Sequence, residues 1–166
     1  KSGQTTKTSG GTYRCAKNPL VSSTKLTWLS IDCLTAANDA VKAQRSSVTT
    51  AANFKAQLPV IELGITTETA NKAEIQAKLD EATKRQVAAQ AKLAAAVTEA
   101  DKKILTTAVG SWTSATRAYA SKIRNIDITI RKLEAAKLAA INKPAELAAN
   151  VADARASARL ICTKGF

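Results

Sequence analysis

Three cysteines are the residues of this chain best suited to covalent chemistry. They stand at positions 15, 33 and 162, so none has the Cys-x-x-Cys spacing of redox motifs and zinc sites. The chain contains no histidine, which removes the commonest metal ligand and the commonest general base. We therefore predict disulfide formation, and no metal or cofactor.

Two disulfide pairings are compatible with these positions. If helical segments run up and down, the chain returns Cys162 to the level of residues 32–40, which favours a Cys33–Cys162 disulfide and leaves Cys15 for contact with a neighbour. The alternative joins Cys15 to Cys162 and buries Cys33 as a small core residue. Three reduced cysteines in a cytosolic protein are the third possibility. A disulfide predicts a secreted, periplasmic or cell-surface location.

Other catalytic patterns are weak. Ser22 and Lys25 have the S-x-x-K spacing of penicillin-binding enzymes, but the S-D-N and K-T-G partners are missing. Four carboxylates could supply acid–base pairs, and all but the last have a lysine or arginine three or four residues on, as in surface ion pairs: Asp80, Glu81, Glu99 and Asp101. We therefore predict that the chain is not an enzyme and has no small-molecule substrate.

The net charge of +12 is unevenly distributed. Residues 1–24 contain four basic residues and no acid, whereas residues 61–110 balance seven basic against seven acidic residues. A basic row follows at seven-residue spacing, with two lysines nearby: Arg117, Arg124, Arg131, Lys122 and Lys132. This row could bind an anionic polymer such as nucleic acid or an envelope polymer, or it could simply be a solvated helix face.

The elements that would position these residues are helices. The chain has 34 alanines, and a heptad seam of larger side chains runs through Trp112, Thr116, Tyr119, Ile123, Ile126, Ile130 and Leu133. Breaks expected at Pro59, Gly110 and Pro144 predict helices over about 24–57, 67–108, 111–142 and 144–162. Ser23 or Thr24 would cap the first. One continuous helix over 67–141 is the alternative.

These segments predict an all-α fold: an elongated up-down bundle of three long helices plus a shorter C-terminal helix, formed by residues 24–166. Residues 1–23, rich in Gly, Ser and Thr, are predicted to be an extended basic arm. The best candidates for strands are Thr12–Ala16 and Arg159–Lys164, and no strand-like segment is long enough to build a sheet. No apolar run is long enough to predict a transmembrane helix.

The predicted function follows from this architecture. We expect a structural or interaction protein of the cell surface, envelope or a filament-type appendage, whose partners are other protein subunits. Its candidate assembly segment is the arm around Thr12, Tyr13, Arg14 and Cys15. The alternative is a polyanion-binding module that uses the basic row and the basic arm.

Overall fold

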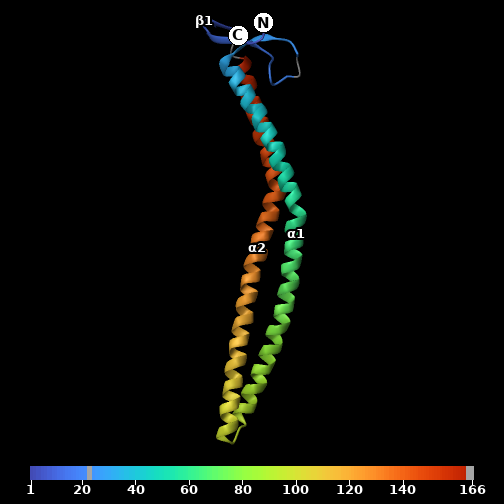
Figure 1. Ribbon diagram of the computed structural model, residues 1–166, viewed down its shortest axis with the longest axis vertical. Helices are drawn as coiled ribbons and strands as arrows, with labels where there is room; N and C mark the ends of the chain where they lie inside the picture. Colours follow the sequence, from blue (N-terminus) through green and yellow to red (C-terminus); the bar gives the residue numbers. More distant parts are fainter. Residues whose placement is uncertain (22–23, 164–166) are drawn as a thin grey trace. The chain divides into compact units, whose positions relative to one another are not determined.

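The chain forms two long helices and a small sheet. The computed structural model describes residues 1–21 and 24–163, and it contains strands β1 (Thr5–Thr8), β2 (Gly11–Ala16) and β3 (Thr27–Ser30) and helices α1 (Ile31–Ala94) and α2 (Glu99–Thr163) (Figure 1). The helical class is confirmed, but the predicted bundle of three long helices and a fourth shorter one is not. The chain divides into two compact units, residues 1–58 with 139–166 and residues 59–138, which are described separately.

In the first unit, the segment predicted as an extended arm folds into a sheet. The strand order is β1-β2-β3 with both pairs antiparallel, and Tyr13 lies opposite Thr6 on one side and Ser30 on the other. Thr12–Ala16 was the correct strand signal, whereas Arg159–Thr163 is helical. The sheet forms because β3, a segment predicted to be the start of a helix, supplies a third strand and gives β2 partners on both sides.

Helix α1 begins seven residues later than the sequence predicts. The Ser30 hydroxyl accepts a hydrogen bond from the Cys33 backbone N–H at 3.1 Å, which is the arrangement of an N-cap. Thr24 lies in the loop before β3, and the alternative cap, Ser23, lies outside the described residues. The cap is therefore Ser30, at the junction of β3 and α1.

The core of the first unit consists mainly of small side chains. Ala37, Ala40 and Ala158 are at most 2% exposed and pack with Leu20 from the loop between β2 and β3. Because alanine side chains are short, the facing backbones of α1 and α2 can approach closely here. The loop is fixed to the helices by Arg155, whose guanidinium donates to the Gln44 side chain at 2.8 Å and to the Leu20 carbonyl at 3.5 Å.

The second unit is a helical hairpin. Residues 59–94 of α1 and 99–138 of α2 are joined by a turn at residues 95–98. Thr98 caps α2, because its hydroxyl accepts from the Asp101 backbone N–H at 3.1 Å and donates to the Asp101 carboxylate at 2.6 Å. The break predicted at Gly110 is therefore wrong, and Gly110 lies inside α2. An isolated glycine costs a helix only about 1 kcal/mol, which packing along a seam readily exceeds.

Two predicted helix boundaries at prolines are also wrong. Pro59 lies inside α1 and Pro144 lies inside α2. A proline in a helix interior costs about 3 kcal/mol through a lost hydrogen bond and a steric clash. The helices continue because the apolar residues on both sides of each proline belong to one seam.

No stretch of helix in the described part of the chain is long and apolar enough to cross a membrane.

Candidate interaction surfaces

The predicted Cys33–Cys162 disulfide is confirmed. It joins the first turn of α1 to the last turn of α2, with a Cα–Cα distance of 4.6 Å and a sequence separation of 129 residues. Cys33 is 1% exposed, so this bond is shielded from solvent on one side. The alternative Cys15–Cys162 pairing does not form, and Cys15 is a free, half-buried cysteine in β2.

The residues predicted to form the assembly arm lie in the central strand of the sheet. Thr12, Tyr13, Arg14 and Cys15 all belong to β2, whose backbone pairs with β1 on one side and β3 on the other. Because both edges of β2 are occupied, its backbone cannot pair with a neighbouring chain. If this sheet pairs with a strand of another chain, it must do so through one of its edge strands.

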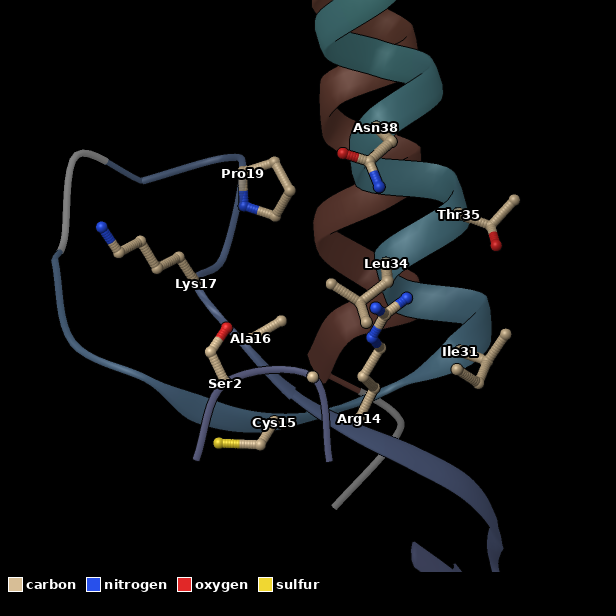
Figure 2. A pocket seen from close by; sticks show the side chains of 11 residues that line it. Ser2, Arg14, Cys15, Ala16, Lys17, Pro19, Ile31, Leu34, Thr35 and Asn38 are labelled. Carbon is tan, nitrogen blue, oxygen red and sulfur yellow. The ribbon is translucent and has the colours of Figure 1, made fainter. Parts of the chain in front are cut away.

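Arg14 and Cys15 line a hollow of 360 Å³ between the sheet and the start of α1 (Figure 2). Figure 2 shows the Arg14 side chain directed toward Leu34, whereas the Cys15 sulfur points away from Leu34. Lys17 also lines the hollow and adds a second positive charge. Arg14 and Lys17 therefore give this hollow a positive charge.

Strands β1 and β3 are the two edges of the sheet, and β1 is the more exposed of them. All four of its residues are exposed, and it pairs with β2 alone. Sequence reasoning missed this strand because Thr5–Thr8 contains no apolar residue and so lacks the alternation typical of strands. The Gly- and Ser-containing turn before Gly11 was the available signal for a hairpin.

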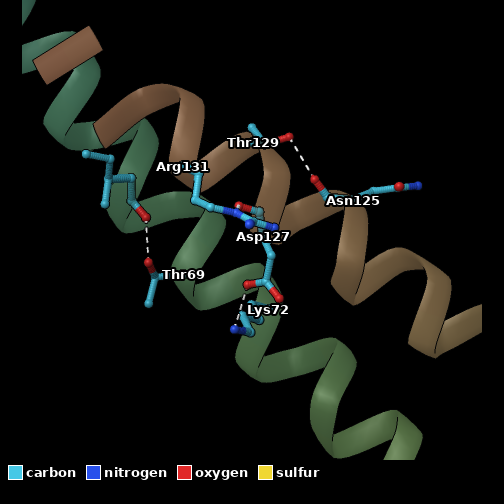
Figure 3. A network of polar contacts seen from close by, with 7 residues as sticks. Thr69, Lys72, Asn125, Asp127, Thr129 and Arg131 are labelled. Carbon is cyan, nitrogen blue, oxygen red and sulfur yellow. Dashed lines mark hydrogen bonds and ion pairs between the residues drawn. The ribbon is translucent and has the colours of Figure 1, made fainter. Parts of the chain in front are cut away.

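The basic row lies on α2 in the second unit. Arg117, Arg124 and Arg131 are exposed, as are the two lysines predicted with them, Lys122 and Lys132. Acidic groups of this unit pair with other cations: Lys72 with Asp127 at 2.6 Å and Lys137 with Glu62 at 2.8 Å. Arg131 donates to the backbone carbonyl of Asp127 at 3.3 Å rather than to its carboxylate (Figure 3). Within the described residues, no ion pair neutralises the five cations of the row.

The candidate catalytic carboxylates lie on exposed helix surfaces. Glu81 pairs with Arg85 at 2.6 Å, Glu99 pairs with Lys102 at 2.7 Å, and Asp80 accepts from Gln76 at 2.8 Å. Asp101 belongs to the cap of α2. Ser22, the candidate nucleophile, lies outside the described residues. Three of these carboxylates therefore accept ion pairs or hydrogen bonds on the helix surface, and Asp101 forms part of the helix cap.

Two ion pairs between residues four apart on α1 form in the second unit. Lys78 lies 2.5 Å from Glu74, and its hydrogen bond and charge hold the pKa of Glu74 below the usual 4.5. Glu74 in turn raises the pKa of Lys78 above 10.5, and Arg85 lowers the pKa of Glu81 in the same way. Glu68 and Lys72 have the same spacing, but Lys72 pairs instead with Asp127 across the hairpin.

These shifts predict a specific pH dependence. The stabilisation from Glu74 and Glu81 is present above pH 4.5 and is lost as the pH falls through their lowered pKa values. The contribution of Lys78 is present below pH 10.5 and is lost as the pH rises through its raised pKa. Side-chain carboxyl NMR titration of Lys78→Gln should move the Glu74 pKa back toward 4.5 and leave the Glu81 pKa lowered. An unchanged Glu74 pKa would contradict this assignment.

The comparisons with known proteins add no relative. Neither the protein-family models, nor the curated proteins, nor the solved structures contain a match to this chain. Function is therefore argued from the geometry of its surfaces.

Proposed function

We propose that this chain is a non-enzymatic, extracytoplasmic structural or interaction protein that contacts another protein subunit through the outer edge of β1. The observation that carries the proposal is that β1 is an edge strand with all four side chains exposed. An accessible strand edge offers backbone donors and acceptors to a strand of another chain.

The register indicates which backbone groups face outward. The β1–β2 hairpin closes at the Thr8–Gly11 pair after a two-residue turn, so Thr8 and Gly11 form a hydrogen-bonded pair. Alternation then makes Thr6–Tyr13 the next bonded pair, and the backbone groups of Thr5 and Lys7 point away from β2. These are the groups that would bind an added strand.

The disulfide supports the proposed location. Structural disulfides persist in secreted, periplasmic and cell-surface proteins and are rare in the cytosol. Cys33–Cys162 also ties together the helix ends beside the sheet, so β1 is presented by a covalently closed unit. A surface, envelope or filament-type component would use such a closed unit to resist unfolding outside the cell.

Self-association with a second copy is the most direct form of the proposal to test. Light scattering over a range of protein concentrations should show mass increasing with concentration for the chain carrying Cys15→Ser, which removes thiol cross-linking. Lys7→Pro deletes one outward N–H without touching the β1–β2 hydrogen bonds, and it should shift the protein toward the monomer. Lys7→Ala is the matched control, because it removes the side chain and keeps the N–H. Equal assembly of the Pro and Ala variants would reject β1 pairing.

Polyanion binding is the second candidate, and the unpaired basic row favours it. Because each phosphate contact releases counterions, affinity for heparin or DNA should fall steeply as the salt concentration rises. Changing Arg117, Arg124 and Arg131 together to Gln should weaken binding at least tenfold and flatten the salt dependence. Changing three cations of the first unit, Lys42, Arg45 and Lys55, to Gln is the control. If both triple variants lose the same affinity for heparin or DNA, binding depends on the net charge of the protein and not on the basic row.

A further inference from the structure

An apolar cavity of 760 Å³ lies in the first unit, beside the end of α2 and the loop that leads into β3. It is lined by Asn18, Leu20, Val21, Lys25, Thr27, Trp28, Leu29, Arg159, Cys162 and Thr163. Neither the disulfide nor the proposed contact at β1 explains this cavity. Its volume falls within the range of about 300–1,000 Å³ that small-molecule sites occupy.

The walls of the cavity are apolar and anchored. Leu20 and Leu29 are 6% and 5% exposed, whereas Trp28 remains 44% exposed. The Leu20 backbone N–H donates to the Asn18 side chain at 2.9 Å, and its carbonyl accepts from Arg155. These bonds hold the backbone of Leu20 in place in the apolar wall.

The charge of the lining is one-sided. Among the described residues that line the cavity, Arg159 and Lys25 are cationic and none is acidic. The guanidinium of Arg159 has neither an ion pair nor a hydrogen bond to any other residue that the structure describes. A planar guanidinium beside an apolar wall suits a carboxylate attached to an apolar body.

We propose that this cavity binds a single-chain amphiphile with an anionic headgroup, such as a fatty carboxylate. The alkyl chain lies against Leu20, Trp28 and Leu29, and the carboxylate pairs with Arg159. Burial of the chain supplies affinity in proportion to its apolar area, while the cation selects the charged headgroup. This inference is independent of the proposed contact through β1.

Tryptophan fluorescence reports occupancy directly. The chain has two tryptophans, so Trp112→Phe leaves Trp28 as the only one. In that background, titration with dodecanoate below its micelle concentration should give a saturable change in Trp28 emission. Dodecanol, which has the same chain length and no charge, should bind at least tenfold more weakly. Arg159→Gln should weaken dodecanoate binding roughly tenfold, the effect of losing one charged hydrogen bond.

Arg45→Gln is the matched control, because it removes an exposed arginine of the first unit that does not line this cavity, and it should leave the affinity unchanged. Equal melting temperatures of the two arginine variants would show that the lost affinity is not caused by unfolding. The proposal is wrong if dodecanoate gives no saturable change, or if dodecanol binds equally well and Arg159→Gln has no effect. A Trp28 emission that changes with protein concentration in the absence of ligand would assign the cavity to a second copy and likewise overturn the proposal.

Discussion

Removing the Cys33–Cys162 disulfide is expected to lower the free energy of unfolding by about 2–5 kcal/mol. The bond links residues 129 positions apart, so in the unfolded state it closes a loop that spans most of the chain. Without it the unfolded chain gains conformational freedom, and the ends of α1 and α2 lose their covalent connection. Urea denaturation of the double variant Cys33→Ser, Cys162→Ser, followed by circular dichroism, measures the difference.

Cys15→Ser is the matched control for this result, since Cys15 is the free cysteine of the described chain. It should leave the urea midpoint nearly unchanged. Dithiothreitol should reproduce the loss of stability in the unaltered protein and have no further effect on the double variant. A midpoint that is the same with and without reductant would contradict the stabilising role of the disulfide.

Ala37→Leu is expected to destabilise the first unit by about 1–3 kcal/mol. Ala37 is 0% exposed and packs in the cluster of Leu20, Ala40 and Ala158, where the facing helix backbones are separated by small side chains. Three additional carbon atoms have no space in this cluster, so the helices or the Leu20 loop must move. Thermal unfolding should show a lowered melting temperature.

The control for Ala37→Leu is Ala43→Leu, on the same helix and in the same unit. Ala43 is exposed, so leucine there meets solvent and changes helix propensity little. Its melting temperature should stay close to that of the unaltered protein. Equal effects of the two substitutions would indicate that the core at Ala37 is loosely packed and that the close helix approach is wrong.

The seams of the helices could be predicted from the sequence, and they carried more information than the predicted breaks. Phe54, Leu58, Ile61 and Ile65 keep the 4-3 spacing across Pro59 and are all half-buried in the structure. The same spacing continues across Pro144 through Leu133, Lys137, Ala140, Pro144 and Leu147. An unchanged register on both sides of a proline indicates one continuous helix, because a true break would free the next segment to begin in a new register.

The sheet could not be predicted in the same way. Its edge strand β1 has no apolar side chains, and β3 contains Leu29 in a pattern that also fits a helix face. Strand pairing is non-local: β3 becomes a strand because β2 lies beside it with the register Cys15 to Trp28. Local propensity cannot report such a partner, so the sequence alone predicts an extended arm for β1 and β2 and the start of a helix for β3.

Composition and spacing by themselves determined the helical class and the apolar seams, and they favoured the Cys33–Cys162 pairing over Cys15–Cys162. These properties repeat along the chain or, for the disulfide, follow from an antiparallel return of the helix. Only the tertiary structure decided where the chain reverses, that residues before α1 form a sheet, and that Arg159 meets Trp28 at one cavity. Each of these depends on contacts between residues far apart in sequence, whose free energy outweighs the local preferences of glycine, proline and short polar strands.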